Sequence, residues 1–166
     1  MILRTDRLIL RGPRPDDLDA MFAIYSDPVN MAHWSTPPHA DISITREMLA
    51  DKIAGFATAP VNFILEHQGR MIGHAGMFRQ WEVGFMLHHP YHRQGLVAEA
   101  MAAILPHLWA TTQAEVLTAD VDPRNLASIR LLERLGFHES HRAEGTFCID
   151  GVWVDSVYFA LKRPAI

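Results

Sequence analysis

The chain has 166 residues and a mass of 18.7 kDa, the size of one folded domain, so we expect residues 1–166 to form a single domain. Hydrophobic residues make up 49% and charged residues 20%, a mixture typical of soluble globular proteins that argues against disorder, collagen and coiled coil. The formal charge of −4, from 15 Lys and Arg against 19 Asp and Glu, argues against nucleic acid as the principal ligand.

The first third of the chain is predicted to hold one strand and two helices. A short apolar run predicts the strand at 8–11, and apolar residues at helical spacing predict a helix over 18–25. The proline-rich segment 27–38 is expected to be irregular and to line a groove. Ser43 is a candidate cap for a second helix with an apolar stripe over 44–56.

The rest of the chain alternates between strand-like and helical patterns. The expected elements are strands at 61–66, 71–78 and 81–87, a helix at 96–109, a strand at 117–121, a helix at 125–135 closed by Gly136, and strands at 137–144 and 153–161. Hairpin-length turns between strands build antiparallel pairs and helical crossovers build parallel ones. The sequence therefore predicts one α/β (α+β) domain with a mixed sheet.

The most informative stretch runs from 81 to 100, where a strand leads through a glycine-containing loop into the start of a helix. Free backbone N–H groups and the positive helix end at such a turn can hold a pyrophosphate. The stretch lacks the Lys-Ser/Thr pair of a P-loop and the Gly-x-Gly-x-x-Gly of a Rossmann turn, so ATP and NAD are not its natural ligands. On this motif alone, Gly95 is about as well explained as the residue of a simple tight turn.

Four separated stretches resemble the GNAT acyl-CoA-dependent N-acyltransferases, and among them the ribosomal-protein alanine acetyltransferase (RimJ/RimL-like) group. They are Thr-Asp-Arg-Leu-Ile-Leu-Arg at 5–11, the block at 84–100, Asn-Leu-Ala-Ser-Ile-Arg-Leu-Leu-Glu-Arg-Leu-Gly-Phe at 125–137, and the closing segment at 151–161. The matches come in the family's order and extend over nearly the whole chain. The resemblance implies the GNAT fold, a mixed, mostly antiparallel twisted sheet of about six to seven strands with about four helices.

The resemblance also implies an enzyme that moves an acetyl group from acetyl-CoA to a primary amine by direct transfer, with no acyl-enzyme and no metal. The residues it places around acetyl-CoA are the backbone amides at Met86 and Leu87, the loop residues Arg93, Gln94, Gly95, Leu96, Val97 and Ala98, and Asn125 and Ser128 on the following helix. Asn125 would hold the pantetheine arm. Ser128 is the nearest candidate to protonate the leaving thiolate, because many GNAT enzymes carry a Tyr where this chain has Leu132.

Glu82 is the candidate catalytic base, since it is one carboxylate on a strand that is otherwise almost wholly apolar. Partial burial there would raise its pKa toward a useful range. The alternative is an exposed glutamate at the end of a strand near Arg79. The resemblance, which places a Glu of several members here, favours the base.

Met31 and Trp34 are large apolar residues in the proline-rich segment, a region where the family binds its acceptor, and they are the candidate substrate-binding residues. The alternative for Trp34 is a residue that caps the core. The sequence does not name the acceptor, which on the resemblance is a protein N-terminus or a small-molecule amine. Two other classes remain open: an acyl-CoA-binding regulatory module that has lost turnover, and a peptide-binding protein that pairs with an edge strand.

The histidines and the single cysteine are not expected to carry chemistry. His88, His89 and His92 lie close in sequence but complete no recognised metal motif, so no metal site is predicted. Cys148 excludes an intramolecular disulfide and has no adjacent base. No apolar run is as long as a membrane span and the N-terminus lacks a signal-peptide centre, so we expect a cytoplasmic protein without membrane contact. The sequence leaves open whether it is a monomer or a homodimer.

Overall fold

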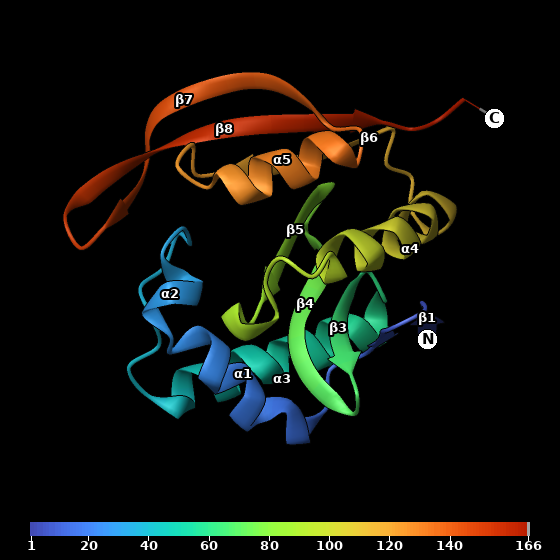
Figure 1. The fold of residues 1–166 in the computed structure, drawn as a ribbon, viewed down its shortest axis with the longest axis vertical. Helices are drawn as coiled ribbons and strands as arrows, with labels where there is room; N and C mark the ends of the chain where they lie inside the picture. The colour runs from blue at the N-terminus through green and yellow to red at the C-terminus, as the bar shows by residue number, and fades with distance from the viewer. Residues whose placement is uncertain (166) are drawn as a thin grey trace.

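The backbone forms one mixed sheet with helices on both faces (Figure 1), in a computed structural model that describes residues 1–165. The strands are β1 (Ile2–Arg4), β2 (Ile9–Arg11), β3 (Asn62–His67), β4 (Arg70–Arg79), β5 (Glu82–Leu87), β6 (Val116–Val121), β7 (His138–Ile149) and β8 (Val152–Lys162). The helices are α1 (Leu18–Tyr25), α2 (Pro28–Met31), α3 (Ile42–Thr58), α4 (Leu96–Thr111) and α5 (Leu126–Arg134), with 3-10 turns at Pro15–Asp17 and His89–Tyr91.

The strand order is β1-β2-β3-β4-β5-β6-β8-β7, and each neighbouring pair is antiparallel except β5 with β6. The predicted mixed, mostly antiparallel sheet is therefore confirmed, although residues 1–165 contain eight strands rather than six or seven and five α-helices rather than about four. In Figure 1, β5 lies at the centre of the molecule, with β6 to β8 and α5 above it, α1 and α3 below it and α2 to its left.

Two hydrophobic clusters hold the helices to opposite faces of the sheet. One packs α4 and Leu132 of α5 against Phe63, Val83 and Phe159 of the strands. The other packs α1, α2 and α3 against the strands and includes Met86. Neighbouring residues of β5 thus point into different clusters, as the period-two alternation of a strand requires.

Three local expectations were wrong. Strand β1 was missed because it has only three residues, two of them exposed, and pairs only with β2. The segment 27–38 contains a one-turn helix, α2, whose first turn is capped by the Asp27 carboxylate accepting from the Val29 N–H at 2.8 Å. The cap of α3 is Asp41 rather than Ser43, because the Asp41 carboxylate accepts from the Ser43 N–H at 2.7 Å.

The end of α5 follows the sequence prediction closely. Gly136 has φ +91° and its N–H donates to the Glu133 carbonyl at 3.0 Å, while the Phe137 N–H donates to the Leu132 carbonyl at 3.0 Å. This left-handed cap turns the chain into β7.

Within residues 1–165, no helix combines the length and the apolar character needed to cross a membrane.

Candidate active site

The sheet opens between β5 and β6. These parallel strands share a single registered pair, Glu82 with Thr118, whereas every other neighbouring pair has at least three. The Thr118 N–H donates to the Trp81 carbonyl at 2.7 Å and closes one end of the gap. Beyond this point two cavities border the diverging strands, and the residues that line both are His33, Trp34, Phe85, Asn125 and Ser128.

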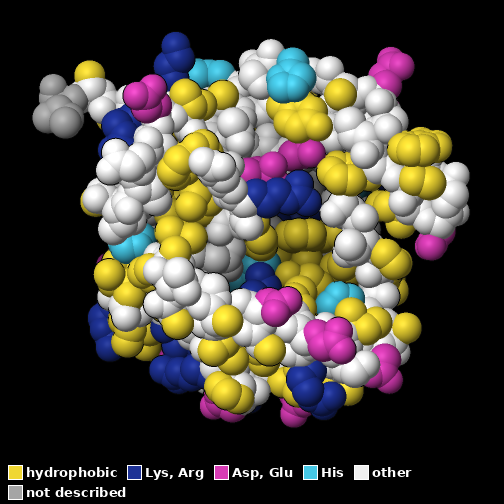
Figure 2. Space-filling view, turned by 180° about the vertical axis from the view of Figure 1, so that it is seen from behind, with side chains coloured by type: hydrophobic (Ala, Val, Ile, Leu, Met, Phe, Trp, Pro, Cys, Tyr) yellow, Lys and Arg dark blue, Asp and Glu magenta, His cyan; other side chains and the backbone are white. Residues whose placement is uncertain are grey.

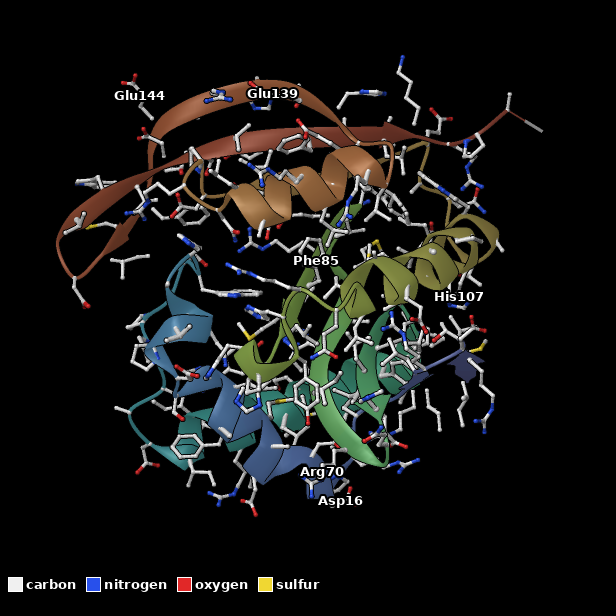
Figure 3. All side chains as sticks on the ribbon, in the orientation of Figure 1. Asp16, Arg70, Phe85, His107, Glu139 and Glu144 are labelled. Atoms are coloured by element: carbon white, nitrogen blue, oxygen red, sulfur yellow. The ribbon has the colours of Figure 1, made fainter. Side chains whose placement is uncertain are left out.

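Figure 3 shows Phe85 on β5 in the middle of the molecule, between α5 and the lower helices. The space-filling view in Figure 2 shows the molecule hollowed near its centre, with hydrophobic side chains inside the hollow and acidic and basic side chains at its edge. The junction of the two cavities therefore lies at the open part of the sheet, where strand backbone is not paired with strand backbone.

The larger cavity has a volume of about 950 Å³ and runs from the end of β5 along the first turn of α4 to α5. This volume is within the range of small-molecule and cofactor sites. Most of the residues predicted to surround acetyl-CoA line it, namely Met86, Leu87, Arg93, Gly95, Val97, Ala98, Asn125 and Ser128. The structure thus brings together side chains that are up to 42 positions apart in the sequence, since Met86 and Ser128 share the cavity.

The loop before α4 presents unpaired backbone donors. Arg93 and Gly95 both have left-handed backbone, with φ +61° and +75°, and Gly95 is the N-cap of α4. Within residues 1–165, the N–H groups from Arg93 to Ala98 have no hydrogen-bond acceptor, and the first helical bond at this end is Glu99 N–H to the Gly95 carbonyl at 3.0 Å. Successive free N–H groups at a helix N-terminus form an anion-binding concavity.

Gln94 and Leu96 do not line the cavity. The Gln94 side-chain amide donates to the Pro90 carbonyl at 3.3 Å, and the Leu96 side chain is 1% exposed in the core. Any contact that these two residues make with a ligand there must come from their backbone N–H groups. The other four loop residues, Arg93, Gly95, Val97 and Ala98, line the larger cavity.

The backbone donors at the end of β5 alternate in direction. The His88 N–H donates to the Ile72 carbonyl at 2.8 Å, and Met86 pairs with His74 two residues earlier in the same antiparallel ladder. Because donors alternate along such a ladder, the Met86 N–H faces β4 and the Leu87 N–H faces the gap beside β6. Of the two strand amides that the resemblance places around acetyl-CoA, those of Met86 and Leu87, the Leu87 N–H is the one directed into the gap.

Helix α5 begins at the junction of the cavities. The Asn125 side-chain oxygen accepts from the Ser128 N–H at 3.2 Å, which makes Asn125 the cap of the helix and leaves its amide nitrogen for a ligand. Ser128 is half-buried on the cavity side of the first turn. Leu132 is buried in the core one turn later, so this position, for which the resemblance implies a Tyr in many enzymes, contributes no hydroxyl here.

The smaller cavity has a volume of about 310 Å³ and contains Glu82 in its wall. The Glu82 side chain is 30% exposed, and its carboxylate lies 3.9 Å from the Arg79 guanidinium. Burial raises the pKa of Glu82; the positive charge of Arg79 opposes this and the negative charge of Asp120 adds to it. Each of the two sequence-based hypotheses for Glu82 describes part of what the structure shows. Glu82 lies at the end of a strand near Arg79, and it is also a partly buried carboxylate in a cavity wall.

Three further carboxylates line the smaller cavity, and sequence reasoning missed them. Asp122 is paired with Arg124 at 2.6 Å and with His33 at 3.3 Å, and Asp155 accepts from the Gly145 N–H at 2.9 Å. Asp120 has a buried carboxylate oxygen with no hydrogen-bond partner within residues 1–165. The sequence could have identified Asp120 as a candidate site residue, because Asp120, like Glu82, is a lone carboxylate in an apolar strand.

The two candidate acceptor residues separate in the structure. Trp34 is half-buried, lines both cavities and packs against Tyr25, His74 and Phe78, with ring centroids 6.2 to 6.4 Å apart. Met31 is 4% exposed and belongs to the hydrophobic cluster beneath α1 and α3 rather than to a cavity wall. Of these two residues, Trp34 contributes to the walls of the two cavities, and it also packs against the hydrophobic cluster of α1 to α3.

The histidines do not group as their sequence spacing suggests. The His92 ring bonds to the Leu87 carbonyl at 2.7 Å, whereas possible ligand atoms of Asp27, His88 and His89 lie within 4.8 Å of one another. Asp27 and His89 already bond to each other at 2.6 Å. The absence of a metal stays a prediction, as does the absence of a role for Cys148, which is exposed and lines neither cavity.

Comparison with known proteins agrees with this geometry. A family profile described as "Acetyltransferase (GNAT) domain" matches residues 7–138. The probable N-acetyltransferase YjcK of Bacillus subtilis is 32% identical over 82 residues, 49% of this chain and 45% of the relative. The [ribosomal protein uS5]-alanine N-acetyltransferase of Escherichia coli is 33% identical over 89 residues, 54% of this chain and 46% of the relative. The alignments thus span less than half the length of these two relatives.

Among solved structures, the ribosomal L7/L12 α-N-protein acetyltransferase RimL in complex with coenzyme A superposes with a TM-score of 0.83. It is 15% identical, and the match covers 98% of each chain. Similarity at this identity establishes the fold. Together with the profile match over most of the sequence, the open sheet and the unpaired amides before α4, it shows that the chain belongs to the GNAT acetyltransferase family.

Proposed function

We propose that this protein is an acyl-CoA-dependent N-acetyltransferase that moves an acetyl group from acetyl-CoA to a primary amine. The observation that carries the proposal is the junction of the two cavities. One holds the unpaired amides of the loop before α4, the other holds Glu82, and both are walled by Phe85, Asn125 and Ser128. A donor in the first cavity and an acceptor in the second would meet there.

We assign acetyl-CoA to the larger cavity in one orientation. Its pyrophosphate would bind to the N–H groups from Arg93 to Ala98, with the Arg93 side chain adding positive charge. The pantetheine arm would pass along β5 toward the Asn125 amide, which brings the thioester to the junction. The RimL structure is a complex with coenzyme A, which supports coenzyme A as the kind of ligand that this fold binds.

The acceptor must be neutral before it can attack. A protein α-amino group has an unperturbed pKa of about 7.7–8.0 and a lysine amine about 10.4, so either needs a proton acceptor near neutrality. Glu82 would take this proton, directly or through water. Its partly buried carboxylate, with a raised pKa, suits a general base.

Transfer then proceeds in one displacement at the carbonyl carbon. The amine nitrogen forms the new C–N bond and the thioester oxygen gains negative charge. The C=O bond then re-forms, the C–S bond breaks with its electron pair going to sulfur, and the nitrogen releases its extra proton to water. The Leu87 N–H is the proposed donor to the oxygen, and Ser128 or a water would protonate the thiolate. Because Cys148 lines neither cavity, it is not positioned to form an acyl-enzyme with an acetyl group held there.

The lining of the smaller cavity favours a positively charged acceptor. Asp120 and Asp155 have no Lys, Arg or His partner within 4 Å among the described residues, and Glu82 has only Arg79 at the 3.9 Å limit of an ion pair. An ammonium group entering the cavity would meet an uncompensated negative field. Trp34, Phe78 and Phe147 add aromatic walls that can face a cation or an apolar side chain.

The test is release of free coenzyme A thiol from acetyl-CoA in the presence of amine acceptors. A peptide beginning with alanine, a small monoamine and a small diamine should be compared, with the same peptide carrying a blocked N-terminus as the control. We expect thiol release that depends on a free amine, and mass spectrometry should find the acetyl group on that amine.

A regulatory module without turnover gives a different result. Acetyl-CoA would then bind in calorimetry, yet no amine would release thiol above the hydrolysis seen without acceptor. Absence of any heat with acetyl-CoA would instead leave a peptide-binding protein and reject the proposed enzyme altogether.

A further inference from the structure

The segment between β1 and β2 contacts the back of the loop that precedes α4. The Arg7 guanidinium binds the Glu99 carboxylate at 2.6 Å, the Arg7 N–H donates to the same carboxylate at 2.9 Å, and the Thr5 hydroxyl donates to it at 2.5 Å. Glu99 lies in the first turn of α4. Three donors from one short segment thus converge on one carboxylate more than 90 residues away in the sequence.

Glu99 would otherwise harm the site. A carboxylate in the first turn of α4 lies close to the amides where a pyrophosphate would bind, and two anions there repel each other. Burial acts to raise the pKa of Glu99, but the hydrogen bonds from Thr5 and Arg7 together lower it, so the group is ionised and its charge must be compensated. Arg7 supplies the compensating charge.

Arg7 also fixes the direction of one peptide group of the loop. Its guanidinium donates to the Gln94 carbonyl at 2.9 Å. The peptide bond is trans, so the Gly95 N–H points away from the Gln94 carbonyl, and therefore away from Arg7. Gly95 lines the larger cavity and Arg7 does not, which places the Gly95 N–H on the cavity side of the loop.

We propose that Arg7, together with Thr5 and Glu99, is a positioning group that holds the phosphate-binding loop in its open-amide conformation without itself contacting the cofactor. The inference rests on the proposed function only in taking the loop as the phosphate site. It assigns a cofactor-binding role to a segment that lies outside the cavity lining.

The first experiment measures coenzyme A affinity of Arg7→Ala by calorimetry. We expect the affinity to fall about tenfold, since two charge-assisted contacts of a partly exposed side chain are lost. Adding Glu99→Gln to Arg7→Ala should restore part of the affinity, because the uncompensated carboxylate is removed. Arg142→Ala is the matched control, since Arg142 forms a similar exposed pair with Glu139 on β7 at 2.7 Å, and it should bind coenzyme A as the unmodified protein does.

The second experiment separates positioning from general stability. Acetyl-pantetheine carries the thioester and the pantetheine arm but no pyrophosphate, so Arg7→Ala should raise the KM for acetyl-CoA and leave kcat/KM for acetyl-pantetheine unchanged. Arg7→Lys keeps a positive charge but cannot span both Glu99 and the Gln94 carbonyl, and its coenzyme A affinity should be intermediate. This variant provides the answer if Arg7→Ala does not fold.

Unchanged coenzyme A affinity in folded Arg7→Ala, or in folded Arg7→Lys if only that variant folds, would overturn the proposal. An equal loss of kcat/KM with acetyl-CoA and with acetyl-pantetheine would also overturn the proposal, because the role of Arg7 would then be structural. If the protein binds coenzyme A but acetylates no amine, the proposed function fails while calorimetry still decides the role of Arg7. If it does not bind coenzyme A, both are rejected.

Discussion

Glu82 is the residue at which burial and neighbouring charge act on the same carboxyl group. Burial and Asp120 raise its pKa, and Arg79 at 3.9 Å lowers it without reversing the shift. A general base works only when ionised, so a raised pKa brings its titration closer to the working pH. The burial of Glu82 and the charges of its neighbours therefore determine how the rate depends on pH.

Replacing Glu82 with Gln keeps the shape of the side chain and removes the proton acceptor. The rate at neutral pH should fall by about 10²–10⁴-fold and recover in part as the pH rises and the amine loses its proton unaided. In the unmodified protein, kcat/KM should decline as the pH falls through the pKa of Glu82, at a pH above the ordinary value of 4.5. Thiol release followed across pH measures both effects.

Ser128→Ala is the comparison for this prediction. A thiol with a pKa of about 8.5, by analogy with cysteine, leaves tolerably as thiolate, so losing its proton donor should cost less than losing the base. High pH should not rescue the serine variant. A Glu82→Gln enzyme as fast as the unmodified one at neutral pH would remove Glu82 from the mechanism.

Asp120→Asn tests whether cavity charge selects the acceptor. The change keeps the size of the side chain but removes a negative charge, so the KM of a cationic amine should rise about three- to tenfold while the KM of acetyl-CoA stays constant. Because Asp120 raises the pKa of Glu82, its neutralisation should also shift the acid limb of the pH profile to lower pH. Both quantities come from the same thiol-release assay.

Glu139→Gln provides the control for Asp120, since Glu139 lies on the outer side of β7, away from both cavities (Figure 3). It should change neither the acceptor KM nor the acid limb. An Asp120→Asn enzyme with the pH profile of the unmodified protein would separate Asp120 from Glu82.

At the scale of elements, the junction of β5 and α4 combines a strand that diverges from β6 while staying paired with β4 and a helix whose first amides are unpaired. Gly95 makes this junction possible, because its φ of +75° is costly for residues with a Cβ atom. A Cβ there would have no close backbone neighbour, and its nearest contact is the Arg7 guanidinium at 3.7 Å. The constraint is therefore one of backbone conformation rather than of space.

Gly95→Val should weaken coenzyme A binding by forcing the loop out of its left-handed conformation, at a cost of about 1–2 kcal/mol. Gly69 offers a matched control, since it also has φ +75° and lies in the β3–β4 turn with open space around it. Gly69→Val should lose comparable stability and keep its coenzyme A affinity. Calorimetry with both variants distinguishes them, and equal affinities would dissociate the loop from the cofactor.

At the scale of the whole molecule, a buried ion cluster joins the N-terminal strands to the first helical turn. The Arg11 guanidinium binds Asp17 at 2.7 Å and Glu66 at 2.5 Å, and the Arg11 and Asp17 side chains are 6% and 4% exposed. These contacts link β2, the turn before α1, and β3. The cluster lies outside both cavities, so it serves the fold rather than the site.

Arg11→Met should destabilise the fold by about 3–5 kcal/mol, because it leaves the Asp17 carboxylate buried without a cationic partner and leaves Glu66 with only Arg14, at 3.9 Å. Asp17→Asn and Glu66→Gln added to Arg11→Met should recover much of this loss. The free energy of unfolding in urea measures both. A single Arg11→Met variant as stable as the unmodified protein would show that the carboxylates gain solvent when the arginine is lost.

The local signals in the sequence determined much of this protein. Helix α5, with Gly136 at its end, and the strand–loop–helix unit around Gly95 depend on contacts between near neighbours, so spacing and turn chemistry predicted them. That Asn125 caps α5 was found only in the structure. Motifs in fixed order predicted the fold and the family. The short strand β1 was not predicted, because its three residues form a strand only by pairing with β2.

Tertiary structure alone decided which residues meet. The divergence of β5 from β6 after one registered pair creates the cavities, and no local pattern encodes where two strands separate. The same packing places Asp120 beside Glu82, directs the Leu87 N–H rather than that of Met86 into the gap, and buries Met31 while leaving Trp34 in the wall. Arg7 and Glu99 are 92 residues apart and unrelated by any sequence period, so their contact exists only because the chain folds back and brings the segment between β1 and β2 against the first turn of α4.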